Sequence, residues 1–308
     1  MGPDEHPSEP FAEPGASLVD TAVPQREPAP LRPASLHGKV AIVTGGGWNI
    51  GRATSLAIAR AGARVIVTSR RRVNLEETVA IGKAEKLDMR LLAGDLTDIG
   101  DVDAIFDDIV SHEGQVDILV CLAGGYGAAV PVADSDPTDW FEVFKRNLFA
   151  TYLCCRRALP SMLQRKHGDI LTCAGGGAFF PMVGVHATAY ACAKAAICRF
   201  TDQLYAEHMD VPGLRVNCFE PGMTLNPDDL TRIEREEAET GKVHPVRELN
   251  HPPEAGAELA MFLLSPAARA LNGRILSVDE DWWRNPDRVA DVVPSDFYRL
   301  RRTFLPDA

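Results

Sequence analysis

The chain has 308 residues, of which 45% are hydrophobic and 24% are charged. This size and composition are ordinary for a globular protein and leave room for one α/β domain of about 250 residues with tails. The 32 Lys and Arg residues against 43 Asp and Glu residues give a formal net charge of −11, which argues against a general nucleic-acid binder.

The first predicted segment is an arm. Residues 1–36 hold eight of the 22 prolines and show no sustained periodicity. Such a composition does not bury enough apolar surface to offset the entropy of ordering the chain. We therefore predict a flexible or loosely docked arm over residues 1–36, followed by a main domain over residues 37–281.

From residue 39 onward, short apolar runs alternate with amphipathic segments. The runs predict strands at residues 40–43, 64–68, 89–93, 117–122, 169–173, 214–219 and 274–278. Helical patterns fall at residues 51–61, 74–85, 101–111, 140–166, 190–208 and 253–264, and we expect the fourth helix to break near Pro160. The alternation predicts an α/β fold, a Rossmann-like doubly wound parallel sheet of seven strands in a single domain.

A glycine-rich turn, TGGGWNIGR over residues 44–52, follows the first predicted strand. Glycines at this place let the backbone approach a pyrophosphate, which rests on the N-terminus of the next helix. The turn resembles the Thr-Gly-x-x-x-Gly-x-Gly turn of the short-chain dehydrogenase/reductase family, with Gly45 and Gly51 matching. Asn49 replaces the middle glycine and tolerates a left-handed backbone, so we expect the turn to survive, with Trp48 and Ile50 beside the cofactor.

Ser69, Arg70 and Arg71 follow the second predicted strand, where no carboxylate is present. A carboxylate there would bind a free ribose 2′-hydroxyl, whereas guanidinium groups suit a 2′-phosphate. The sequence therefore favours NADP(H) over NAD(H), with Arg70 the better candidate for the contact. The alternative is that these arginines form a solvated turn.

Other segments resemble the family's cofactor contacts. After the fourth predicted strand, Cys121 and Leu122 replace the two asparagines of the family's Asn-Asn-Ala-Gly signature. After the sixth, a Pro-Gly turn resembles the one that lies beside the nicotinamide. The residues that the resemblance places at the cofactor are Asp95, Leu96, Ala123, Gly124, Tyr190, Lys194, Pro221, Gly222 and Thr224.

Tyr190 and Lys194 are four residues apart and share one face of a predicted helix. An ammonium group near a phenol lowers the phenol pKa, and such a phenol can pass a proton while hydride moves to or from a nicotinamide. The resemblance makes Tyr190 the general acid/base, and it makes Lys194 a ligand of the nicotinamide ribose. The resemblance also implies that Asn147 holds a water molecule that links the lysine to bulk solvent. The alternative is that Asn147 is an ordinary asparagine on the helix surface.

The family usually ends its fifth strand with two serines, the second of which polarises the substrate carbonyl. Ala174 and Gly175 stand in those positions here, and no serine occurs between residues 161 and 265. Three alternatives remain open. The Thr188 hydroxyl could donate to the substrate oxygen, the backbone N–H groups of residues 175–177 could form an oxyanion pocket, or the substrate or a water could supply the polarisation.

The resemblance implies an NADP(H)-dependent oxidoreductase acting on a small-molecule carbonyl/alcohol pair, in a homotetramer or homodimer. Because the serine is missing, two other functions stay open: dehydration, a C–C bond step or imine reduction in the same site, or a non-catalytic cofactor-binding scaffold. We expect residues 223–252 to form a substrate lid. The aromatic and basic tail over residues 282–308 either caps the substrate pocket or packs between subunits.

The seven cysteines are scattered and include no Cys-x-x-Cys pair. This usage predicts free, buried thiols in a cytoplasmic protein, and no spacing suggests a metal site. No apolar run approaches the roughly 20 residues that a membrane span requires. The sequence therefore predicts neither a membrane nor a nucleic acid as partner.

Overall fold

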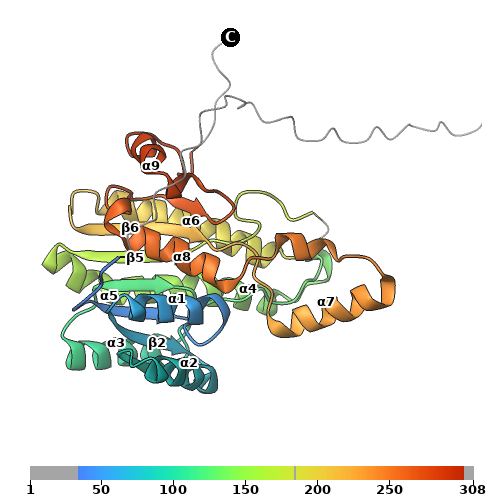
Figure 1. Cartoon of the computed structure of the whole chain (residues 1–308), viewed down its shortest axis with the longest axis horizontal. Coiled ribbons are helices and arrows are strands. Elements are labelled where there is room, and N and C mark those ends of the chain that lie inside the picture. Colours follow the sequence, from blue (N-terminus) through green and yellow to red (C-terminus); the bar gives the residue numbers. More distant parts are fainter. Residues whose placement is uncertain (1–33, 184, 302–308) are drawn as a thin grey trace, which may run out of the picture.

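Seven parallel strands form one sheet in the computed structural model, which describes residues 34–183 and 185–301 (Figure 1). The strands are β1 (Val40–Thr44), β2 (Arg64–Ser69), β3 (Met89–Ala93), β4 (Ile118–Cys121), β5 (Gly168–Cys173), β6 (Leu214–Glu220) and β7 (Ile275–Ser277). Their spatial order is β3-β2-β1-β4-β5-β6-β7, and every neighbouring pair is parallel. The predicted Rossmann-like sheet is confirmed. The predicted arm lies outside the described residues except for residues 34–36.

The helices of the described residues cover both faces of the sheet. They are α1 (Asn49–Arg60), α2 (Arg72–Ala84), α3 (Ile99–Glu113), α4 (Pro137–Phe144), α5 (Ala150–Arg165), α6 (Thr188–Glu207), α7 (Pro227–Thr240), α8 (Pro253–Leu264) and α9 (Pro286–Val292). Alternate strand residues point to opposite faces, so Val43 packs in one core with Leu259 of α8 and Ile42 packs in another with Leu153 of α5. Among these helices, none is long and apolar enough to cross a membrane.

The winding of the sheet reverses at β1, which pairs with β2 on one side and with β4 on the other. In open α/β sheets, ligands bind in the crevice that such a reversal leaves at the carboxyl ends of the strands. Thr44, Cys121, Cys173 and Glu220 end their strands at this edge. The fold therefore gathers the loops after β1, β4, β5 and β6 around one crevice.

Four helices begin two residues before their predicted starts: α1, α2, α3 and α6. The first turn of a helix is satisfied by caps and solvent, so it carries little apolar periodicity for a pattern to detect. Asn74, the first residue of the predicted second helix, lies inside α2, and Arg71 is the cap residue. By contrast, Asp98 caps α3 by accepting from the amide of Asp101.

The predicted break near Pro160 is wrong. The helix α5 runs through Pro160, which is exposed, so the carbonyl that loses its amide partner there faces water. The irregularity lies earlier, in a π-helical turn over Lys145–Phe149 between α4 and α5. Such turns are frequent at functional sites, and this one holds Asn147 in a fully buried position.

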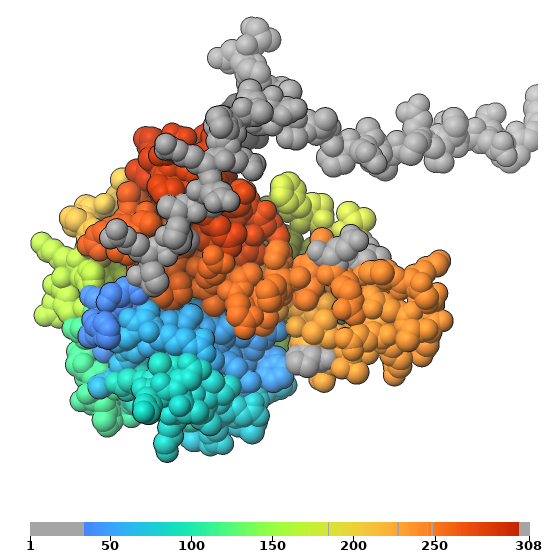
Figure 2. Space-filling model, in the orientation of Figure 1, coloured from blue at the N-terminus to red at the C-terminus, as the bar shows by residue number. Residues whose placement is uncertain are grey.

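Residues 223–252 contain the helix α7 and a 3₁₀ turn over Pro245–Leu249, which form a projection at one side of the molecule (orange in Figures 1 and 2). The Asn226 side chain caps α7 by accepting from the amide of Asp229, and Gly241 ends the helix in a left-handed conformation. Ile233 of this helix is fully buried. The sequence patterns predicted a lid here but no helix.

The described part of the C-terminal tail packs on the same chain. Trp283 is buried in the core with its ring 5.2 Å from that of Phe262 in α8. Arg301 pairs with Asp202 of α6 at 2.7 Å, and the amide of Ile275 donates to the carbonyl of Tyr298. The packed core therefore continues beyond residue 281, the predicted end of the domain.

Candidate active site

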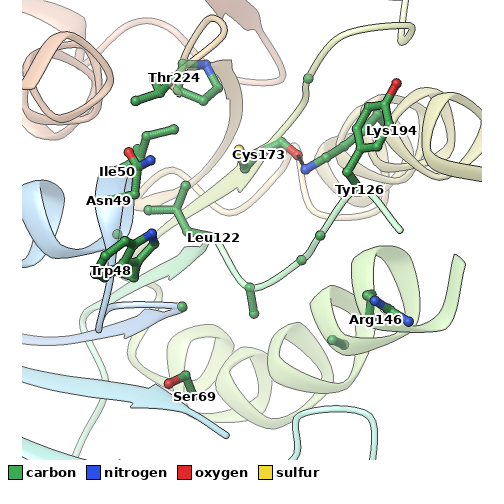
Figure 3. Close-up of a pocket in the computed structure, with 18 of the residues that line it drawn as sticks. Trp48, Asn49, Ile50, Ser69, Leu122, Tyr126, Arg146, Cys173, Lys194 and Thr224 are labelled. Carbon is green, nitrogen blue, oxygen red and sulfur yellow. Dashed lines mark hydrogen bonds between the residues drawn. The ribbon is translucent and has the colours of Figure 1, made fainter. Parts of the chain in front are cut away.

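A cavity of about 850 Å³ opens at the carboxyl edge of the sheet (Figure 3). Every residue predicted for the cofactor or catalytic site lines it except Asn147, Gly177 and Thr188. Figure 3 shows Trp48, Asn49 and Ile50 on one side and Lys194 on the other. The crevice that the topology creates thus holds both the glycine turn and the Tyr190 pair.

The glycine turn has little room for side chains. A Cβ atom on Gly51 would overlap the carbonyl of Gly45, and Gly45 itself has a φ of 68°. Asn49 takes the left-handed conformation expected of it, with a φ of 47°. Trp48 precedes α1 and makes no side-chain cap, so the first amide groups of this helix are free of a side-chain acceptor. Such a helix end suits a phosphate.

The other end of the cavity carries positive charge. Arg70 and Arg71 are exposed, and a terminal nitrogen of Arg70 lies 4.0 Å from a carboxylate oxygen of Asp95. Burial raises the pKa of Asp95, but hydrogen bonds from Thr97 and the charges of Arg70 and Lys145 outweigh this and lower it. Asp95 accepts from both the amide and the hydroxyl of Thr97, so its carboxylate is held in place.

The turn after β4 is braced without its two asparagines. The Thr44 hydroxyl oxygen accepts from the amides of Leu122 and Ala123, at 3.0 and 2.9 Å. The side-chain amide of Asn147 donates to the carbonyls of Gly125 and Val143, at 2.9 and 2.8 Å. Asn147 therefore lies behind the cavity wall and stabilises it.

Tyr190 and Lys194 lie one turn apart on α6. The Lys194 ammonium is buried, lies 5.5 Å from the centre of the Tyr190 ring and donates to the carbonyl of Cys173 at 3.0 Å (Figure 3). Burial raises the pKa of Tyr190, and the lysine lowers it by less, so the net shift is upward. The lysine acts in the predicted direction, but burial of the phenol outweighs it.

Gly175 lies directly against Tyr190 and Lys194. A Cβ atom there would lie 2.5 Å from the Tyr190 hydroxyl oxygen and 3.3 Å from Cε of Lys194. No side chain fits at this position unless the tyrosine moves. The glycine therefore sets how closely the backbone after β5 approaches the phenol.

The two protein groups predicted for the missing donor, the backbone of residues 175–177 and the Thr188 hydroxyl, lie in different places. Gly175 and Gly176 line the cavity, whereas Gly177 does not. Thr188 is exposed at the start of α6, where its hydroxyl accepts from the indole N–H of Trp140 at 3.1 Å. The backbone of Gly175 and Gly176, and not the Thr188 hydroxyl, faces the space beside Tyr190.

Several cavity residues were missed from the sequence. The Tyr126 ring lies 4.9 Å from that of Tyr190, and Arg146, Met182, Glu220 and Asp279 also line the cavity. Nothing in local periodicity marks these positions, because their side chains meet only after the strands have paired. An acidic residue directly before a Pro-Gly turn was the one available signal for Glu220.

The cavity fits a nicotinamide dinucleotide. The Asn49 side-chain oxygen and the Thr224 hydroxyl are buried and have no hydrogen-bond partner within the described structure. Buried polar atoms of this kind need partners, which the hydroxyl, amide and phosphate groups of such a cofactor provide. The glycine turn, the two arginines after β2 and Thr224 would then hold the dinucleotide. Tyr190 and Lys194 would lie at its nicotinamide end.

Comparison with known proteins identifies the family. The model of the short chain dehydrogenase family matches residues 39–238. Galactitol 2-dehydrogenase of Rhizobium johnstonii is 32% identical over 250 residues, covering 79% of this chain and 95% of the relative. The 7alpha-hydroxysteroid dehydrogenase of Escherichia coli is 32% identical over 248 residues, covering 79% of this chain and 93% of the relative.

A crystal structure of hydroxysteroid dehydrogenase from Escherichia coli superposes with a TM-score of 0.68 at 29% identity, covering 79% of this chain and 96% of that one. The sequence match, the sheet order and the position of the glycine turn all indicate the same family. The chain belongs to the short-chain dehydrogenase/reductase family of oxidoreductases, whose members bind a nicotinamide cofactor and act on small molecules.

Proposed function

We propose that this chain is an NADP(H)-dependent oxidoreductase that transfers hydride between nicotinamide and a carbonyl/alcohol substrate, with Tyr190 as general acid/base. One observation carries the proposal: a single cavity joins the glycine turn, the arginines after β2 and the Tyr190–Lys194 pair. A scaffold that only bound a nucleotide would not require a buried ammonium beside a phenol at one end.

Arg70 and Arg71 support NADP(H) over NAD(H). Both line the cavity at the end of β2, and the strand ends in Ser69, not in a carboxylate that would repel a 2′-phosphate. Guanidinium groups bind phosphate oxygens in a fork geometry. The expected contact of the 2′-phosphate is Arg70 first and Arg71 second.

A bound nicotinamide supplies or accepts the hydride at its C4 atom. Tyr190 gives its hydroxyl proton to the substrate oxygen during reduction and takes one back during oxidation. The Lys194 ammonium stabilises the phenolate that reduction leaves behind. Asn147 braces the wall beside this pair, and we keep for it the predicted role in a water relay to the lysine.

The substrate oxygen needs a second donor, and we assign this role to the backbone N–H groups of Gly175 and Gly176, which line the cavity beside Tyr190. Backbone N–H groups aimed at a developing negative charge contribute on the order of 10²- to 10³-fold in rate. Because Gly175 contacts the phenol directly, a substrate oxygen bound to Tyr190 lies beside this backbone.

Two features support a homo-oligomer. A second, apolar cavity of about 610 Å³ lies on the outer side of α4, α5 and α6, lined by Phe141, Phe149, Tyr152 and Phe200 among others. Phe141 is 58% exposed and Tyr152 is 43% exposed, which is unusual for aromatic side chains gathered on one face. Sedimentation analysis separates a dimer, a tetramer and a monomer.

The missing serine favours a second candidate function: another reaction in the same site, such as dehydration, a C–C bond step or imine reduction. In the lid, Met223, Thr224 and Leu249 line the cavity, so residues 223–252 reach the space where the substrate would bind.

All seven cysteines are free and six are buried, which supports the proposed cytoplasmic location.

The test is single-turnover absorbance of enzyme-bound NADPH with acetophenone, cyclohexanone, ethyl acetoacetate and 2,3-butanedione. The proposal expects loss of the NADPH band with at least one of them. If NADPH binds and no carbonyl or alcohol changes the band, the oxidoreductase assignment fails. Titration with NADH in parallel tests the cofactor preference.

A further inference from the structure

The wall of the cavity beside Tyr190 carries almost no polar side chains. It is lined by residues 122–126 in the loop after β4, and by residues 173–176 and Met182 at and after the end of β5. Among these described residues, none has a charged, amide or aliphatic hydroxyl side chain. Their side-chain donors are the Tyr126 phenol and the Cys173 thiol, and the thiol donates to the carbonyl of Ala174 at 3.2 Å. We call this surface the apolar wall, since it offers a substrate mainly apolar side chains and backbone groups.

Tyr126 is the first large apolar surface of this wall. Its ring centre lies 4.9 Å from that of Tyr190, and the two ring planes are tilted by 41°. Figure 3 shows Tyr126 on the same side of the cavity as Lys194 and on the opposite side from Trp48 and Asn49. Tyr126 is 38% exposed, so its packing against Tyr190 leaves part of the ring open to an incoming group.

Met182 is the second large apolar surface. A Cβ atom on Gly176 would lie 3.1 Å from its sulfur, and one on Gly177 would lie 3.0 Å from its Cε, so the thioether packs on the glycine run after β5. A Cβ atom on Gly175, in the same run, would lie 2.5 Å from the Tyr190 hydroxyl oxygen. The Met182 side chain and the Tyr190 phenol therefore rest on the same short stretch of backbone.

Further apolar side chains are exposed next to these two surfaces. Phe180 and Val183 flank Met182 in the sequence and are 80% and 91% exposed, the highest values among the large hydrophobic side chains that the structure describes. In the lid, Met223 and Leu249 line the cavity and are 45% and 59% exposed. Exposed apolar side chains gathered around a cavity are typical of a surface that binds an apolar group.

Two charged side chains that line other parts of the cavity have partners within the protein. A carboxylate oxygen of Asp279 lies 2.7 Å from Nε2 of His251, and Nε of Arg146 donates to the carbonyl of Glu142 at 3.1 Å. These interactions compete with any substrate hydroxyl for the same groups. A polyhydroxy substrate would leave polar groups unpaired against the apolar wall, which costs binding free energy that an apolar ring does not lose.

We propose that the apolar wall binds an apolar ring attached to the substrate carbonyl, so that the substrate class is ring-bearing ketones and the corresponding secondary alcohols. This rests on the proposed function. The carbonyl oxygen lies at the Tyr190 hydroxyl and the backbone of Gly175, and the ring covers Tyr126 and Met182. An aromatic ring gains further attraction from the Tyr126 ring and the Met182 sulfur, so aryl ketones are the best ligands of this class.

Binding without turnover tests the ring site first. The enzyme saturated with oxidised cofactor cannot reduce a ketone, so isothermal titration calorimetry measures the affinity for the ligand alone. The ligands are 2-acetonaphthone, acetophenone and 4-acetyltetrahydropyran, which carry the same acetyl group on a larger aromatic ring, a smaller aromatic ring and a polar ring. We expect the dissociation constant to rise about tenfold from each ligand to the next, because a fused ring adds roughly 50 Å² of apolar area and the ether oxygen would lose its hydrogen bonds to water.

Two substitutions locate the ring site. Tyr126→Ala and Met182→Ala each remove one large apolar surface of the wall, and each is expected to weaken 2-acetonaphthone binding by about tenfold with cofactor affinity unchanged. The ratio of the acetophenone dissociation constant to that of 2-acetonaphthone should therefore fall in both variants. Met209→Ala is the matched control, since Met209 follows α6, is 65% exposed and lines neither cavity. It should keep the wild-type ratio.

Equal affinity of the wild type for the three ketones overturns the proposal, and so does a preference for 2-acetonaphthone that survives in both variants. Burial of the Met182 segment between subunits is the competing explanation. Met182→Ala would then change the sedimentation coefficient and leave the ratio unchanged, which also overturns the proposal. If 2-acetonaphthone binds as expected but NADPH reduces none of the ketones, the proposed function fails and the ring site stands. If NADPH reduces them without preference for the larger ring, the ring site alone fails.

Discussion

Gly175→Ser would restore the hydroxyl that this site lacks, yet we expect it to slow the enzyme. The new Cβ atom would lie 2.5 Å from the Tyr190 hydroxyl oxygen, and Cβ contacts need at least 3.0 Å, so the oxygen must retreat by at least 0.5 Å. The phenol is half-buried and its ring lies 4.9 Å from that of Tyr126, so it cannot move without disturbing this aromatic pair.

The size of the effect follows from this displacement. A misplacement of about 1 Å in a catalytic group costs on the order of 10²-fold in rate. Half that displacement corresponds to about tenfold in kcat, or about 1.4 kcal/mol of transition-state stabilisation. Gly175→Ala creates the same contact without a hydroxyl and should lose as much.

The assay compares kcat and KM for NADPH-dependent carbonyl reduction in both variants. Gly125→Ala is the control, since it lies in the same cavity and its Cβ atom would meet only Cδ of Arg146, at an ordinary 3.6 Å. It should keep wild-type kcat. Higher activity in Gly175→Ser than in the wild type would refute the reasoning, because the position would then accept the serine.

Three further predictions follow from single contacts. Arg70→Glu should weaken NADPH binding by roughly 10- to 100-fold, from loss of a charge-assisted contact of about 1.5–3 kcal/mol, while NADH binding is unchanged or improved; fluorescence titration of the cofactor checks this. Asn147→Ala leaves the carbonyls of Gly125 and Val143 without their amide donor and should lower the free energy of unfolding by about 2 kcal/mol, measured by urea denaturation. For Glu220, the raised pKa means that the folded state binds the proton more tightly, so its stabilising contribution is complete below the ordinary glutamate pKa and is lost as pH rises through the raised value. Urea denaturation of the wild type and Glu220→Gln across that window should show the stability of the wild type falling relative to the variant.

Local pattern was enough to predict the sheet. Each strand of a parallel sheet is buried on both faces and reads as a short apolar run, so β1, β2 and β6 were visible in the sequence. The glycine turn was equally visible, since Gly45 and Gly51 are required by backbone contacts that no side chain permits. These features depend on neighbours in sequence or on one repeated rule of strand pairing.

The helix α7 shows what pattern alone missed despite local signals. Asn226 before a proline and Gly241 at the far end are ordinary start and stop residues, and Arg232 pairs with Glu236 one turn on. The helix buries little besides Ile233, so its apolar periodicity is weak. Capping residues, and not hydrophobic spacing, carried the information there.

The candidate site divides in the same way. Tyr190 and Lys194 share a helix, so their spacing predicted them. Tyr126 and Glu220 reach the site from other loops, and their approach to Tyr190 depends on how β4, β5 and β6 pair. The size of the pKa shift of Tyr190 also depends on burial, which spacing does not report.

The central claim is that Tyr190 acts as the general acid/base for hydride transfer between the nicotinamide and the substrate. Deuterium transfer from the cofactor tests this claim most directly. NADPH carrying deuterium at both C4 positions is incubated with the wild type and with Tyr190→Phe, using the panel carbonyl that reacts fastest, and the alcohol is analysed by mass spectrometry. We expect one deuterium on the carbinol carbon with the wild type, and a rate at least about 10²-fold lower with Tyr190→Phe. NADPH consumption without deuterium in the product, or equal rates in the two proteins, would contradict the account.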